Sequence, residues 1–204
     1  MNKEICISRG NMKLGLIHNI SLPPIITCEP NSPCFKKCYA MKAFRLYNRV
    51  KKGWTKNYKL YKNNPDKFFN LIKTHIQDKN LDYFRWAVGG DIPDNAYFSG
   101  MIKIANECPN TKFMIFTKRF KIISDCKETI PNNLQINLSS WNSVPIPKKL
   151  RNKYRVAWFL DPKDKDPRVA KVKNIFHCPS DCMACNKTCW NLSKLKKDVL
   201  FIKH

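Results

Sequence analysis

The stretch YFRWAVGGDIPDNAYFSGMIKIANECPNTKFMIFTKR, residues 83–119, decides the expected fold of this 204-residue chain. Its apolar runs at 83–90 and 112–117 have the length and the aromatic and β-branched content of buried strands. Between them, residues 93–108 carry apolar side chains at helical spacing, with Asp94 near the start of the expected helix. Strand, helix and strand in this order predict a right-handed βαβ unit and a parallel sheet.

The alternation continues on both sides of this unit. Four further strand-length runs lie at 23–27, 133–139, 154–160 and 172–176. Helical patterns precede the unit from Tyr39 to Val50, where Gly53 is expected to interrupt the helix, and again from about Pro65 to Ile76. Six strand candidates, mostly separated by helix-length segments, predict the α/β class with a partial, six-unit β/α barrel.

Polar motifs follow several of these strands. Gly-Gly-Asp (89–91) follows the second strand candidate, Thr-Lys-Arg (117–119) the third and Ser-Ser-Trp (139–141) the fourth. One cysteine group follows the first candidate and another follows the sixth. Because ligands bind at the carboxyl ends of the strands in parallel β/α folds, we expect both cysteine motifs and the functional site at this face.

Length and composition place limits on the class of protein. The length predicts a single domain over residues 1–204, with a C-terminal four-cysteine metal-binding segment at 177–190. No apolar run is long enough to span a membrane and no secretory leader is evident, so we expect a cytoplasmic protein without a membrane partner. Ten cysteines in a reducing compartment favour metal ligation or redox chemistry over disulfides.

The first cysteine group is Cys28, Cys34 and Cys38, with the spacing C-x5-C-x3-C. Three thiolates can hold a [4Fe–4S] cluster and leave one iron open for a small molecule, whereas a closed zinc site needs four ligands. The alternative is a zinc site that Cys6, His18 or another distant side chain completes. We expect the cluster ahead of zinc.

The second group is Cys178, Cys182, Cys185 and Cys189, with the spacing C-x3-C-x2-C-x3-C. Four thiolates within twelve residues indicate a metal site. Both zinc and a second [4Fe–4S] cluster accept four cysteines, so both metals stay open at this group. The isolated cysteines, which are Cys6, Cys108 and Cys126, are expected to be buried small side chains.

Three cysteines after the first strand of a six-unit β/α chain, with a glycine pair after the second, resemble the core of radical S-adenosylmethionine (SAM) enzymes. The motifs CFKKCYA, RWAVGGDIPD, FMIFTKR and CPSDCMACNKTCW resemble more closely a phage protein family known as gene product 88, which is radical-SAM-like in appearance. The resemblance covers residues from about 20 to 190. A phage origin implies the cytoplasm of the host.

The resemblance to radical SAM enzymes implies roles for two motifs. Cys28, Cys34 and Cys38 would ligate a [4Fe–4S] cluster, and Gly89, Gly90 and Asp91 would form the segment beside the SAM amino group. The spacing differs from the usual C-x3-C-x2-C, and the aromatic Tyr39 follows the last cysteine instead of preceding it. The structural alternative is that the glycines permit a tight turn and that Asp91 caps the next helix.

The formal net charge of +23 favours a polyanionic partner, and nucleic acid is the class that we expect. Basic and aromatic residues interleave in the stretch at 42–62, where the expected contact residues are Arg45, Arg49, Lys51 and Lys52. Three hypotheses stay open. The protein is a radical-SAM-like enzyme, a non-catalytic iron–sulfur protein that binds nucleic acid, or a zinc-stabilised scaffold for a partner protein.

Overall fold

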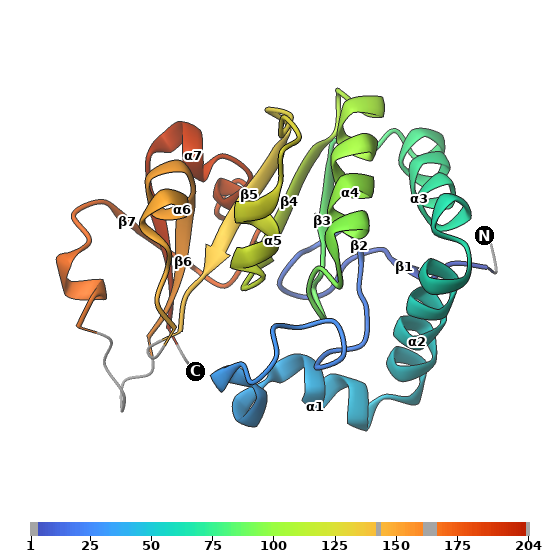
Figure 1. Cartoon of the computed structure of the whole chain (residues 1–204), viewed down its shortest axis with the longest axis horizontal. Coiled ribbons are helices and arrows are strands. Elements are labelled where there is room, and N and C mark those ends of the chain that lie inside the picture. Colours follow the sequence, from blue (N-terminus) through green and yellow to red (C-terminus); the bar gives the residue numbers. More distant parts are fainter. Residues whose placement is uncertain (1–3, 142–143, 161–166, 203–204) are drawn as a thin grey trace.

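A computed structural model describes residues 4–141, 144–160 and 167–202 of the chain (Figure 1). Its strands form one eight-stranded sheet with the spatial order β1-β2-β3-β4-β5-β6-β8-β7. The strands are β1 (Ile7–Ser8), β2 (His18–Ile20), β3 (Tyr83–Trp86), β4 (Lys112–Thr117), β5 (Leu134–Ser139), β6 (Arg155–Leu160), β7 (Ile175–His177) and β8 (Asp198–Ile202).

All pairings in the sheet are parallel except the one between β1 and β2 at the edge. From β2 to β6 the strands follow one another in chain order, as they do in a β/α barrel. In the described residues the sheet is open, and β1 and β7 are its edges. The α/β class and the parallel sheet are therefore confirmed, with eight strands where the sequence predicts six.

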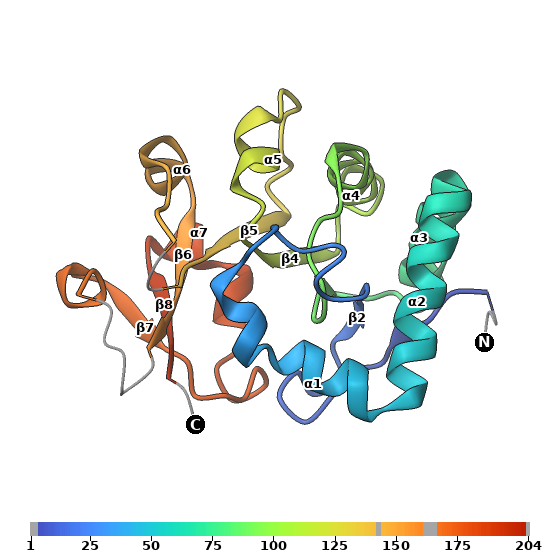
Figure 2. The ribbon, with the colours of Figure 1, turned by 60° about the horizontal axis from the view of Figure 1, so that its bottom comes forward.

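Helices α3 to α6 lie in a row on one side of the sheet (Figure 2). The helices are α1 (Tyr39–Leu46), α2 (Asn48–Asn63), α3 (Pro65–Asp78), α4 (Asn95–Glu107), α5 (Phe120–Asp125), α6 (Lys148–Lys153) and α7 (Leu192–Leu195). Three 3₁₀ turns, at Pro33–Lys37, Val169–Lys171 and Thr188–Trp190, complete the regular elements. Because each crossover joins neighbouring strands with the same hand, these helices fall on one face.

The alternation of side chains along the strands divides the core into two clusters. On β4, Phe113 and Ile115 belong to the main cluster beneath the helices, whereas Met114 belongs to a smaller cluster on the other face. Leu14 and Trp190 come from segments outside the helical layer and also join the smaller cluster. The face opposite α3 to α6 is therefore also covered, by the N-terminal loop and a C-terminal segment that includes α7.

The predicted first strand at 23–27 is wrong. These residues form a turn, and the first parallel strand is β2, five residues earlier. Two adjacent prolines lack the N–H groups that a central strand needs, and Ile25 has a φ of 73°, which a β-branched residue rarely adopts. The chain therefore leaves the sheet before it reaches Cys28.

Gly53 does not interrupt the helix as predicted, because it lies inside α2. A Cβ atom there would lie 3.3 Å from Cys6 Cβ, so the glycine lets the N-terminal segment pack closely on the helix. Asn57 secures the same contact, since its Oδ1 accepts from Cys6 N–H at 2.8 Å and its Nδ2 donates to Cys6 O at 2.9 Å. Close packing thus outweighs the low helix propensity of glycine.

His18 on β2 and His75 on α3 form a hydrogen-bonded pair, with 2.8 Å between Nδ1 and Nε2. Burial lowers the pKa of both rings from the ordinary value of 6.5, and the charges of Arg9 and Lys79 lower the two pKa values further. The unfolded chain therefore binds more protons than the folded chain below pH 6.5. Stability contributed by the neutral pair is present above this pH and is lost as the pH falls below it.

We expect the unfolding midpoint to fall by several degrees between about pH 7.5 and 5.5, above the range where most carboxylates titrate. Thermal scans by circular dichroism measure it. The variant His75→Gln should flatten this dependence, because only one titrating ring remains. A midpoint that rises on acidification would contradict the assignment.

Candidate functional site: two cysteine groups

The first cysteine group lies beside the carboxyl ends of β3 and β4. Cys28 ends the turn after β2, Cys34 lies in the 3₁₀ turn Pro33–Lys37, and Cys38 precedes α1. All three side chains are partly exposed. The placement of this group at the strand ends agrees with the sequence prediction.

Arg119, at the end of β4, ties this segment to the sheet. Its Nη1 donates to the carbonyl of Cys28 and to the carboxylate of Glu29, both at 3.3 Å, and its Nη2 donates to the carbonyl of Pro93 at 3.1 Å. From the sequence, Lys118 and Arg119 in the Thr-Lys-Arg motif are candidates either to bind an anion or to face water. The structure instead gives Arg119 a positioning role, and Lys118 Nζ donates to Ser139 Oγ at 2.8 Å.

The environment of Cys28 is unfavourable for a thiolate without a cation. Burial, together with the charges of Asp91, Cys38 and Cys34, raises the pKa of its thiol to about 12. The three thiols are therefore close enough to act on one another electrostatically. A bound metal would displace the protons, because metal ligation requires the thiolate.

Asp91 is buried beneath this group and does not cap the next helix. Its Oδ1 accepts from Ile92 N–H at 2.8 Å and its Oδ2 accepts from Lys118 N–H at 2.9 Å. The cap of α4 is Asp94, whose side chain accepts from Tyr97 N–H. Burial raises the pKa of Asp91, although the hydrogen bonds lower it. Asp91 thus joins the ends of β3 and β4.

The glycine pair permits close packing around the same turn. A Cβ at Gly89 would lie 2.2 Å from the ring of Trp54. Gly90 has a φ of +76°, and a Cβ there would lie 2.5 Å from Thr27 Oγ1 and 2.7 Å from the carbonyl oxygen of Leu22. The structural interpretation of both glycines is therefore supported by this geometry.

We expect Gly90→Ala to lower the free energy of unfolding by about 1–3 kcal/mol, because it adds backbone strain and a clash with Leu22. Chemical denaturation measures this loss. The control is Gly53→Ala, whose gain in helix propensity of up to about 1 kcal/mol offsets its tight contact with Cys6. Equal effects of the two substitutions would contradict this account of Gly90.

The second cysteine group lies in the crossover between β7 and β8, from Cys178 to Cys189. Because β7 and β8 are parallel neighbours, the chain must return from the carboxyl end of β7 to the amino end of β8. It does so across the face of the sheet opposite α3 to α6, where Cys182 and Cys189 join the smaller core cluster. The prediction that both motifs lie at the strand ends is therefore wrong for this group beyond Cys178.

Hydrogen bonds fix the four-cysteine segment to elements far away in sequence. Cys182 N–H donates to Lys13 O at 2.8 Å, Asn137 Nδ2 donates to Cys189 O at 3.1 Å, and Trp190 Nε1 donates to Phe84 O at 3.3 Å. The segment is thereby bound to the N-terminal loop, β5 and β3. It acts as a cover for the centre of the sheet.

The four thiols of this segment lie within electrostatic range of one another. Burial, together with the charges of Cys178, Cys182 and Cys185, raises the pKa of Cys189 to about 12. Burial also raises the pKa of Cys182. Ser180 N–H donates to Cys178 Sγ at 3.4 Å, a contact that stabilises a thiolate ligand.

Arg85 provides positive charge next to these thiols. It lies on β3, and its charge lowers the pKa of both Cys182 and Cys189. Its guanidinium lies 5.2 Å from the ring centre of Phe116, and its Nε is buried without a hydrogen-bond partner in the described structure. The Arg85 side chain is partly exposed, and a metal–thiolate centre would place negative charge beside it. The sequence analysis did not identify Arg85.

The described residues contain no group of three or more His, Cys, Asp or Glu side chains that is arranged to hold a metal ion. The isolated cysteines differ in burial from one another. Cys108 is buried as predicted, whereas Cys6 is exposed and Cys126 is partly exposed. The predictions for Cys6 and Cys126 are therefore wrong.

The four residues predicted to contact nucleic acid are all exposed, on α1 and α2. Arg49 and Lys52 line a shallow pocket of about 420 Å³ together with Cys6, Gly53 and Lys56. Arg45 and Lys51 do not line this pocket. Lys56 was missed, although its spacing from Arg49 and Lys52 places it on the same helix face.

No helix in the described parts of the chain is long and apolar enough to cross a membrane. No curated protein and no solved structure is significantly similar to the chain. A match to a protein family covers almost the whole sequence and confirms the family resemblance found in its motifs. Over residues 3–198 the chain matches gene product 88, and it belongs to that family.

Proposed function

We propose that this protein is an iron–sulfur protein with two thiolate centres of different roles. Cys28, Cys34 and Cys38 hold a [4Fe–4S] cluster with an open iron. Cys178, Cys182, Cys185 and Cys189 hold a second metal centre, either zinc or another cluster. The reducing cytoplasm of the phage host is the compartment where such free thiols persist.

One observation carries the proposal. A segment of eleven residues brings three partly exposed thiols to the carboxyl ends of the strands, beside the buried carboxylate of Asp91. In parallel β/α proteins this edge is where reactive groups collect. The donor set of three thiols fits a cluster with a vacancy, and binding includes a local rearrangement that brings the sulfur atoms together.

A SAM-dependent radical reaction is the activity that we propose for the first centre. A cluster held by Cys28, Cys34 and Cys38 would supply the electron for the reductive cleavage of SAM. The residues of this chain hold the site in place. Arg119 fixes the carbonyl of Cys28, and Asp91 joins the ends of β3 and β4 through the N–H groups of Ile92 and Lys118.

The second centre has the surroundings of a structural site. Cys182 and Cys189 are only 8% and 6% exposed, and both lie with Trp190 in the smaller core cluster. Closed four-ligand sites contribute directly to folding free energy. This burial favours a second candidate function, in which the metal only maintains the fold and the protein is not catalytic.

Anaerobically purified protein, reduced with dithionite, tests the proposal. Adding SAM should change the electron paramagnetic resonance spectrum of the reduced cluster and release 5′-deoxyadenosine. The control is Cys34→Ser, which removes one ligand of the first centre and leaves the second group intact. An intact cluster that neither responds to SAM nor cleaves it would leave the non-catalytic candidate.

A further inference from the structure

The most uneven charge distribution in the chain lies in α1, α2 and the segments that flank them. Residues 30–65 contain ten Lys and Arg residues and no Asp or Glu. Across the whole chain, by contrast, 15 acidic residues accompany 38 basic ones. A region of one charge sign generates a potential that attracts polyanions and is strongly salt-dependent.

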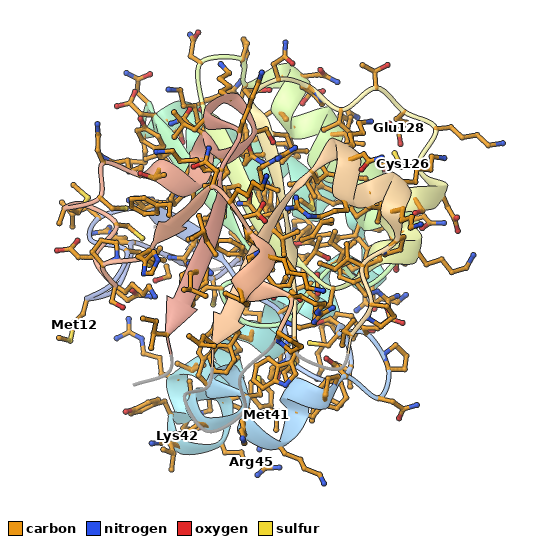
Figure 3. All side chains as sticks on the ribbon, turned by 90° about the vertical axis from the view of Figure 1, so that its left-hand side faces the viewer. Met12, Met41, Lys42, Arg45, Cys126 and Glu128 are labelled. Carbon is orange, nitrogen blue, oxygen red and sulfur yellow. The ribbon has the colours of Figure 1, made fainter. Side chains whose placement is uncertain are left out.

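The structure places these cations on the surface. Lys42 and Arg45 project from α1 at one end of the molecule, where Figure 3 labels them beside Met41. Along α2, Arg49, Lys52 and Lys56 line the shallow pocket of about 420 Å³. The spacing of one and two helical turns sets these three cations in a row, as successive phosphates of one strand require.

Exposed apolar and aromatic side chains lie within the basic region. Tyr47, at the junction of α1 and α2, is 60% exposed, and the neighbouring Leu46 is 62% exposed. Tyr39, at the start of α1, is 67% exposed, and its hydroxyl donates to Val88 O at 2.6 Å, which fixes the ring beside the cysteine group. An exposed ring is a suitable platform for an unstacked base, and the hydrogen bond of Tyr39 also holds its ring in place.

We propose that α1 and α2 bind a single-stranded nucleic acid whose phosphates follow Arg49, Lys52 and Lys56 and whose bases stack on Tyr47. The strand would pass Tyr39 at the entrance to the first cysteine group. Exposed rings distinguish a single strand from a duplex, because only unstacked bases can use them. The inference does not depend on the metal proposal, since no cysteine of either group contributes to the surface.

The experiment measures fluorescence anisotropy of a labelled single strand of about 20 nucleotides, longer than the ~4–16 nucleotides that such sites usually cover. DNA and RNA strands are compared with a duplex of the same length, from about 50 to 200 mM salt. Anionic vesicles rich in phosphatidylserine provide the competing polyanion.

The test variant combines Arg49→Gln, Lys52→Gln and Lys56→Gln. We expect binding at least about tenfold weaker, and a salt slope smaller by about 2, since each phosphate of a single strand contributes about 0.7. The matched control combines Lys103→Gln, Lys127→Gln and Lys148→Gln, which removes the same charge from exposed positions on or beside α4, α5 and α6. The affinity of the control variant should fall by less than about threefold, because salt screens charges that lie far from the bound strand.

Two further variants separate stacking from charge. Tyr47→Ala should weaken single-strand binding by about fivefold or more and duplex binding much less. A variant with Arg49→Lys, Lys52→Arg and Lys56→Arg keeps the three charges and should preserve binding. Preserved binding in this variant shows that the test variant binds more weakly because it has lost charge and not because it misfolds. Equal losses in the test and control triples, tighter binding of the duplex, or binding of vesicles alone would each overturn the proposal.

Discussion

Cys189→Ser is expected to lower the free energy of unfolding by about 3 kcal/mol or more and the midpoint by roughly 6–12 °C. Cys189 is buried in the smaller core cluster, and its carbonyl accepts from Asn137 Nδ2 on β5. If the proposed metal holds the crossover on the sheet, loss of one of its four ligands would open that site. Removal of metal by a chelator should have the same effect on the unsubstituted protein.

The matched control for Cys189→Ser is Cys126→Ser. Cys126 is a partly exposed cysteine outside both groups, so its exchange should change the midpoint by a degree or two at most. Differential scanning calorimetry compares the two variants with and without chelator. If Cys189→Ser is no less stable than the control, a metal at the second cysteine group does not stabilise the fold.

Combined replacement of Cys28, Cys34 and Cys38 by serine is expected to remove one complete cluster while the fold persists. The three side chains are partly exposed, and Arg119 holds the segment through backbone carbonyls that the substitution leaves in place. Iron content should fall by about four atoms per chain, and the broad absorption near about 400 nm should fall with it. The midpoint of unfolding should change little compared with Cys189→Ser.

Iron and acid-labile sulfide assays on the triple variant check this prediction, and circular dichroism verifies the fold. The comparison with Cys189→Ser separates the roles of the two groups, because one variant should lose stability and the other should lose the open cluster. Unchanged iron and sulfide in the triple variant would contradict the assignment of the first centre.

Local sequence pattern predicted the central elements well and the edges poorly. The strand at 112–117 is observed with the same bounds, because its apolar side chains face core on both sides of the sheet. The strand at 23–27 fails because its apolar residues lie in a turn next to two prolines. The strand Asp198–Ile202 was missed, although it pairs between β6 and β7. Its position depends on long-range pairing that no local pattern reports.

For the candidate site, too, the sequence predicted the features that depend on local pattern and missed those that depend on long-range packing. Cysteine spacing found both groups, and the parallel-sheet rule placed the first group at the strand ends. The spacing and strand-end rules could not predict the roles of Arg85 and Arg119, because these roles depend on which distant segments pack against β3 and β4. The four-cysteine crossover takes its path because β7 and β8 are parallel neighbours in the sheet. This pairing cannot be read from the local sequence.

The most direct measurement is iron, sulfide and zinc analysis of the anaerobically purified chain together with its visible spectrum. The account predicts a brown protein with at least about four iron and four sulfide per chain and broad absorption near about 400 nm, lost on replacement of Cys28, Cys34 and Cys38. A colourless protein that contains zinc alone, or no metal at either cysteine group, would contradict it.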